Sequence, residues 1–160
     1  MGAPAFRMGF ALLAPNGLSY DLQTPWWHLP EARTLADAFP DTQIILNHAG
    51  LPANRSAEGI AGWKRAMTTL AARPNVAVKI SGLGQPGHRW TVEANRDIVL
   101  TVIELFGAAR CMFASNFPVD SLCARFAEIY DGFVAITRDF SAAERSGLLA
   151  GNAIRIYGMD

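Results

Sequence analysis

Four polar side chains follow short apolar runs at similar intervals along the chain: Gln23, His48, Ser81 and Asn116, which are spaced 25, 33 and 35 residues apart. A histidine can bind a metal ion or polarise a carbonyl group, and serine and amide side chains can hold a substrate by hydrogen bonds. His48 is the main candidate, because it ends the apolar run in QIILNHAGLP, residues 43–52.

Each of these residues also has a structural interpretation. His48 could bond a backbone carbonyl, Asn116 could cap the turn after it, and Ser81 could pack in a tight strand-to-loop turn. An amide cannot act as a general base as a carboxylate does, so Asp120, four residues beyond Asn116, is the nearest acid that could substitute. We favour Asp120 as the N-cap of a helix that begins at about residue 122.

Further candidates lie beside the apolar runs. Lys79 alternates with apolar neighbours, which favours an interior position, where its charge needs a partner or a substrate carboxylate; the alternative is that it extends to a rim. His88 and Arg89 stand in a loop with Gly and Pro, where they could bind an anionic or hydroxylated substrate or form a solvated pair. Trp27 could form part of an aromatic wall over the site, although a plug over the core is the favoured interpretation.

The elements that must position these residues are read from periodicity and turn residues. Strands are expected at 18–23, 43–48, 76–81 and 111–116, because apolar residues alternate there. Helices are expected at 5–14, 31–39, 56–72, 92–106 and 122–135, with Ser56 as the N-cap of the third and a last helix opened by a capping box at 141–144. Four strands, each followed by a helix, predict an α/β fold of four parallel βα units, with residues 1–160 as a single domain.

The carboxyl ends of parallel strands form the ligand site of such folds, and all four polar residues fall there. Counting by twos places His48 on the same face as Ile44 and Leu46.

Composition excludes several classes of function. The 14 acidic residues balance the 14 basic ones, so no basic face for nucleic acid is implied. Gly82-x-Gly84 is too short for a dinucleotide motif. Cys111 and Cys123 lack the spacing of a metal site, and reduced thiols are expected. No apolar run reaches the length of a membrane span and no secretory signal is visible, so we expect a cytoplasmic protein without membrane contact.

The segments NHAG, KISGL and SNFPVD, in that order and spacing, with LSYDLQ before them and GNAIRIYG after them, resemble the amidohydrolase superfamily. The branch they resemble is the amidohydrolase-related (amidohydrolase 2) group that contains sugar lactonases and 2-pyrone-4,6-dicarboxylate lactonase-like enzymes. The resemblance covers residues 5–158 and implies a (β/α)8 TIM-type barrel. Eight βα units need about 250 residues, so this chain is expected to supply the carboxyl-terminal half, strands five to eight.

The resemblance implies a hydrolase that cleaves a C–O bond of a small lactone with activated water; decarboxylation and amide hydrolysis are variants within the family. His48 matches the late-strand histidine, and Asn116 stands where the last-strand aspartate is expected. The family's His-x-His pair is absent from this sequence. A divalent metal such as Zn would therefore need His48 together with ligands from outside this chain, and the resemblance leaves metal dependence open.

The residues assigned to the substrate by this interpretation are Gln23, Trp27, Lys79, Ser81, His88 and Arg89. The alternative interpretation is a half-barrel without catalysis of its own. Either way, the open edges of a half-barrel predict a homodimer or pairing with a missing amino-terminal half.

Overall fold

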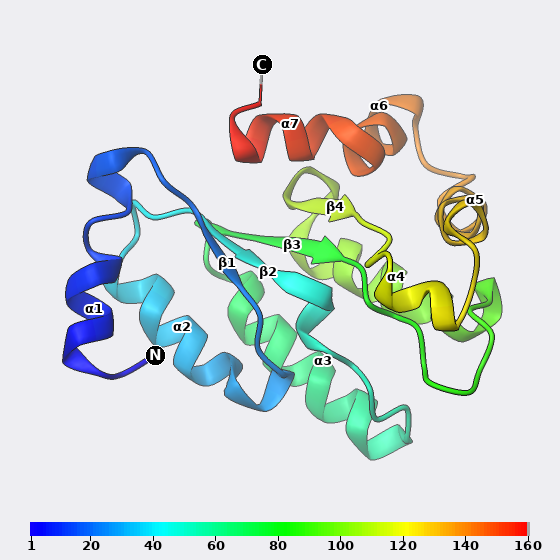
Figure 1. Cartoon of the computed structure of the whole chain (residues 1–160), viewed down its shortest axis with the longest axis horizontal. Coiled ribbons are helices and arrows are strands. Elements are labelled where there is room, and N and C mark those ends of the chain that lie inside the picture. Colours follow the sequence, from blue (N-terminus) through cyan, green and yellow to red (C-terminus); the bar gives the residue numbers. More distant parts are fainter. Residues whose placement is uncertain (160) are drawn as a thin grey trace.

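The computed structural model describes residues 1–159, in which four strands form one parallel sheet in the order β1-β2-β3-β4 (Figure 1). The strands are β1 (Tyr20–Leu22), β2 (Ile44–Leu46), β3 (Val76–Ile80) and β4 (Cys111–Phe113). The predicted parallel βα units are therefore confirmed. The strands end earlier than the alternation suggested, since β2 stops at Leu46 and β4 stops at Phe113.

The helices follow the strands in the expected order. They are α1 (Pro4–Phe10), α2 (Leu29–Ala38), α3 (Ala57–Ala71), α4 (Val92–Phe106), α5 (Phe126–Ile136), α6 (Ala142–Ser146) and α7 (Asn152–Tyr157). The expected caps at Ser56 and at Ser141 with Glu144 are confirmed: Ser56 accepts from the amide of Gly59 at 3.1 Å, and Ser141 and Glu144 form a reciprocal capping box.

The expected helix start near residue 122 is wrong. Residues Val119–Leu122 form a short 3-10 turn, and α5 begins only at Phe126. The reason is a second capping box, in which the amide of Arg125 donates to the carboxylate of Glu128 at 2.8 Å. The first turn of α5 is therefore set by Glu128 rather than by an acid before residue 122.

The two faces of the sheet are covered by different helices. On one face the strands pack against α2, α3 and α4, with Leu46, Val78 and Phe113 in the main buried cluster (Figure 1). On the opposite face a smaller buried cluster forms where the strands meet α7; its members are Ile45, Ala77, Met112, Ala153, Ile156 and Tyr157. The predicted alternation along the strands is therefore real, and it sorts side chains between these two clusters.

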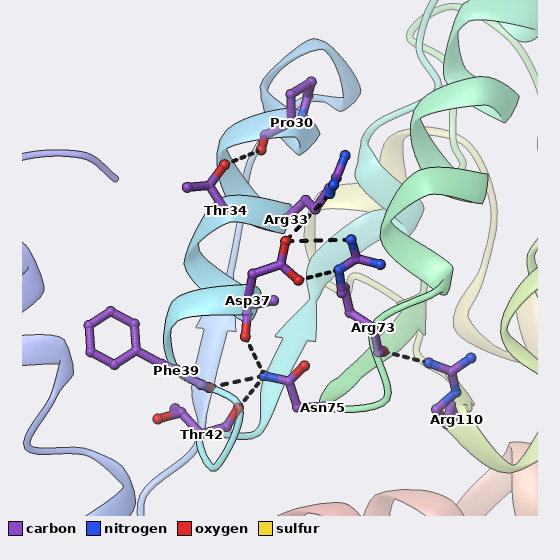
Figure 2. A network of polar contacts seen from close by, with 10 residues as sticks. Pro30, Arg33, Thr34, Asp37, Phe39, Thr42, Arg73, Asn75 and Arg110 are labelled. Atoms are coloured by element: carbon purple, nitrogen blue, oxygen red, sulfur yellow. Dashed lines mark hydrogen bonds and ion pairs between the residues drawn. The ribbon is translucent and has the colours of Figure 1, made fainter.

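The loops that lead into the strands are joined by backbone-directed side chains (Figure 2). The amide Nδ2 of Asn75, just before β3, donates to the carbonyls of Ala36, Phe39 and Thr42, at 3.2, 3.0 and 3.2 Å. One side chain thereby ties the end of α2 and the loop before β2 to the loop before β3.

Arg110 plays the same part beside β4. Its guanidinium donates to the carbonyls of Phe106, Arg73, Val76 and Ala71, at 2.9, 2.8, 3.2 and 2.9 Å. The amino ends of the strands are thus held by a network that contains no candidate for catalysis.

Two strands of the sheet have one neighbour each within residues 1–159, namely β1 and β4 at its edges. No helix in the same range is both long enough and apolar enough to span a bilayer.

Candidate active site

The turn after β2 holds His48 in a sparsely populated backbone conformation. His48, Ala49 and Leu51 have φ values of 55°, 49° and 55°. Left-handed conformations cost a residue with a side chain roughly 1–2 kcal/mol each, so three in one turn need support from the surrounding fold. Part of that support is visible: the amide of Leu51 donates to the carbonyl of His48 at 2.8 Å, and Nε1 of the buried Trp63 in α3 donates to the carbonyl of Ala49 at 2.8 Å.

His48 is consequently not part of the strand, and counting by twos does not determine its direction. Ile44 and Leu46 pack in the cluster under the helices, which is the face that the alternation assigned to His48. The turn instead carries the imidazole to Ser81 at the end of β3, with 2.9 Å between Nδ1 and Ser81 Oγ. The expectation that strand parity orients His48 is therefore wrong, because the strand ends two residues earlier.

A second residue that restricts the position of the His48 imidazole is Gly82, the residue after Ser81. A Cβ atom at Gly82 would lie 2.7 Å from Nδ1 of His48 and 3.1 Å from its Cβ, and Gly82 has a φ of +60°. Glycine is therefore required at this position for two independent reasons, the backbone conformation and the closeness of the ring. Ser81 is 1% exposed, whereas His48 is partly exposed.

With Nδ1 bonded to Ser81, Nε2 is the ring nitrogen of His48 that has no hydrogen-bond partner among residues 1–159. Burial, the largest influence, lowers the pKa of His48; the charge of Asp120 opposes this shift and that of Lys79 adds to it. His48 is therefore neutral near pH 7, and a hydrogen bond at Nδ1 is the usual way in which a protein sets the tautomer of a functional imidazole.

Asn116 and Asp120 form a second polar pair, in the loop after β4. Asn116 has a φ of 56°, and its Nδ2 donates to Oδ1 of Asp120 at 2.8 Å. The other carboxylate oxygen accepts from the amide of Gly84 at 3.3 Å, and Asp120 is 5% exposed. The expectation that Asp120 is a helix N-cap is wrong, since it lies inside the 3-10 turn and bonds across the sheet edge to the loop after β3.

The loop that begins at Ser81 joins these two pairs. Ser81 and Gly82 contact His48, and Gly84 contacts Asp120, whose charge acts on His48. All four non-glycine residues with positive φ in the described chain, His48, Ala49, Leu51 and Asn116, lie beyond the ends of β2 and β4. Such outliers cluster at functional sites, so this edge of the sheet is the candidate active site.

Lys79 has a protein partner of its own. Its Nζ lies 3.4 Å from Oδ1 of Asp21 on β1 and 5.4 Å from the ring centroid of Tyr157 on α7. The hydroxyl of Tyr157 donates to the same carboxylate oxygen at 2.7 Å; burial, followed by this bond, raises the pKa of Tyr157. Lys79 is thus partly exposed, with a carboxylate partner from this chain.

The remaining candidates do not join this cluster. Arg89 pairs with Glu128 of α5 at 3.2 Å and is largely exposed, and His88 is exposed in the same loop. Trp27 is 59% exposed and makes an edge contact with Trp26. Gln23 is exposed one residue beyond β1.

A metal ion does not fit these residues alone. Within residues 1–159, no group of three or more His, Cys, Asp or Glu side chains lies close enough together to hold one. Nε2 of His48 and the carboxylate of Asp120 are fewer than the three protein ligands of an ordinary catalytic zinc site. A metal at His48 would need further ligands from outside this part of the chain.

Sequence patterns missed three features of this site: the hydrogen bonds of Asp120, the contact of Gly82 with His48, and the hydrogen bond from Trp63 to the turn that holds His48. The available signal was Gly82-x-Gly84, a pair of glycines directly after a strand that ends in a polar residue. Such glycines mark a close approach of backbone to other groups.

Comparison with known proteins assigns the chain to a family. The family model described as amidohydrolase matches residues 2–159. An L-fucono-1,5-lactonase of Burkholderia multivorans is 32% identical over 165 residues, which cover 96% of this chain and 56% of the lactonase. An uncharacterised protein of Sinorhizobium fredii is 49% identical over 154 residues, which cover 96% of this chain and 52% of that protein.

Solved structures agree in fold. An amidohydrolase of Burkholderia multivorans with bound zinc superposes with a TM-score of 0.90 at 29% identity, covering 99% of this chain and 58% of that one. Amidohydrolase 2 of Bifidobacterium longum gives 0.76 at 25% identity, covering 99% and 56%. This chain thus spans about half the length of the relatives it matches, and its four βα units are half of their TIM barrel. The chain belongs to the amidohydrolase family.

Proposed function

We propose that this chain carries half of the active site of a hydrolase that opens a small lactone with water. The observation that carries the proposal is the fixation of His48 by Ser81 and Gly82, which leaves Nε2 unbonded at the carboxyl edge of the sheet. The 32% identity to L-fucono-1,5-lactonases makes a sugar lactone the first substrate to test.

The reaction requires two proton movements, and a neutral histidine suits both. If Nδ1 donates to Ser81, the lone pair of Nε2 can take a proton from water as its oxygen bonds to the carbonyl carbon. The ring C–O bond then breaks, and the imidazolium returns the proton to the departing alkoxide, which gives a hydroxy acid. The carboxylate of Asp120 stabilises the imidazolium between these steps, in agreement with the direction of its effect on the pKa of His48.

Asn116 supports this assignment in a different way. Its Nδ2 is held by Asp120, so its Oδ1 can accept a hydrogen bond from the attacking water or from a substrate hydroxyl. Gln23 and Trp27, at the end of β1 and beyond it, are proposed as outer substrate contacts. The same holds for His88 and Arg89 in the loop after β3. A divalent metal at His48 would need ligands from outside residues 1–159, so the proposed steps use the side chains of this chain alone.

The test is hydrolysis of L-fucono-1,5-lactone by the purified chain, followed through acid release with a pH indicator. His48→Ala is expected to lower kcat/KM by about 10²–10⁴-fold, the usual contribution of a positioned acid–base group. His28→Ala is the matched control, because His28 is exposed and its Nδ1 pairs with Glu31, 2.9 Å away. Equal activity of the two variants would remove His48 from the mechanism.

A second candidate function rests on the sheet edges. Because β1 and β4 each pair with one strand in the described chain, a non-catalytic half that acts by assembly is the alternative. Light scattering after size exclusion distinguishes the two readily: a species of twice the 17.3 kDa chain mass with lactonase activity supports a closed, active pair. A dimer or larger species without activity on any lactone supports the assembly role.

A further inference from the structure

A cavity of about 310 Å³ lies outside the candidate active site, between the amino-terminal halves of α3 and α4. Its lining comes entirely from residues 55–101 and includes none of His48, Ser81, Asn116 and Asp120. The volume is in the range of small-molecule sites, and the walls do not depend on a second half-barrel.

The cavity is lined by the positively charged side chain of Arg55. Arg55 forms no ion pair within residues 1–159. It donates to neutral acceptors: Nη2 to the carbonyl of Leu83 at 3.1 Å and to Oδ1 of Asn95 at 3.4 Å, and Nη1 to the carbonyl of Ala94 at 3.4 Å. Its Nε is buried and has no acceptor in the part of the chain that the structure describes.

This arrangement favours an anion at Arg55. Removal of a guanidinium from water without a counter-charge is unfavourable, and burial lowers the pKa of Arg55. Nη1 has one long bond in an exposed position, so its other hydrogen remains available to a ligand. A planar carboxylate is the group that a guanidinium binds most specifically.

The other walls define the rest of the ligand. Asp97 and Thr101, one turn apart on α4, and Gln85 in the loop after β3 present oxygen and amide groups that suit hydroxyls. Asp97 would repel a second negative charge, so a single carboxylate at the Arg55 end is indicated. Ile60 and Ile98 provide an apolar surface for a carbon chain.

We propose that this cavity, here called the Arg55 site, binds a small hydroxylated monocarboxylate. A second cavity of about 70 Å³ shares Arg55 and Gln85 with it and reaches Gly82, the glycine against His48. Occupancy of the Arg55 site can therefore act on the loop that positions His48. The proposal does not depend on the lactonase assignment.

The test uses sodium gluconate as the probe, with sorbitol and acetate as matched compounds that lack the carboxylate or the hydroxyls. Isothermal titration of the purified chain is expected to show gluconate binding at least about tenfold tighter than either, since each lost charged hydrogen bond is worth on the order of one decade in affinity. Equal binding of sorbitol or acetate would overturn the proposal, as would no gluconate binding at about 10 mM, ten times a 1 mM dissociation constant.

Variants locate the binding. Arg55→Gln is expected to weaken gluconate at least about tenfold, and Arg55→Lys, which keeps the charge but loses the planar fork, is expected to weaken it less. Arg138→Gln, at an exposed arginine outside the cavity that pairs with Asp139, is expected to stay within about twofold of the parent. Loss of binding in His48→Ala but not in the Arg55 variants would place gluconate in the active site and refute the Arg55 site, whatever the outcome of the lactonase assay.

Discussion

Substitution of Gly82 by alanine would test whether the backbone after β3 positions His48. The new methyl group would meet Nδ1, Cγ and Cβ of His48 at 2.7, 2.9 and 3.1 Å. Because Cβ of His48 is among these atoms, rotation of the ring alone cannot relieve the contact. The left-handed conformation adds roughly 1–2 kcal/mol and the overpacking roughly 1–3 kcal/mol, so we expect Gly82→Ala to lower the free energy of unfolding by about 2–5 kcal/mol.

A second glycine separates these two contributions. Gly17 has a φ of +65°, and a Cβ there would meet nothing within 4 Å, so Gly17→Ala should lose only the roughly 1–2 kcal/mol of the conformation. The assay is urea unfolding of both variants, together with the imidazole resonances of His48. Equal destabilisation by the two substitutions, with unshifted His48 resonances, would refute the contact as the origin of the positioning.

Two further predictions concern pH and the strand amino ends. The pKa of His48 is lowered from 6.5 by burial, so the unfolded state takes up a proton more readily. The contribution of His48 to stability is therefore complete above about pH 6.5 and declines as the pH falls toward the lower folded pKa. The midpoint of urea unfolding should fall with pH between about pH 7.5 and 5, and His48→Gln should reduce this dependence on pH. Arg110→Ala removes four hydrogen bonds to backbone carbonyls and should lower the free energy of unfolding by about 2–4 kcal/mol, with Arg110→Lys intermediate; a loss below about 1 kcal/mol would contradict the role of the network.

Local signals explain what the sequence predicted well. The existence of the strands and the caps at Ser56 and Ser141 depend on neighbours within a few residues, as does α4, which was expected at 92–106 and has those bounds. These features follow from side-chain period and from hydrogen bonds that span three residues.

The side chains of the candidate site are positioned by contacts between residues far apart in the sequence, and no local pattern predicts such contacts. Asp21, the partner of Lys79, lies 58 residues before it, and the same carboxylate accepts from Tyr157, 136 residues away. The direction of the His48 side chain depends on a left-handed turn that a hydrogen bond from Trp63 of α3 stabilises. The alternation of apolar residues in a strand does not predict that turn. Asp120 could be recognised only by its distance from Gly84 on the neighbouring loop.

The separation of the Asn75 and Arg110 network from the His48 edge has a consequence for adaptation. The network joins the amino ends of the strands (Figure 2). Because the candidate chemistry lies beyond their carboxyl ends, a change in one region leaves the bonds of the other in place. Laboratory evolution of new specificity should therefore draw on the loops after the strands and spare the loops before them. A library confined to the former should keep a larger fraction of folded members than one of equal size confined to the latter.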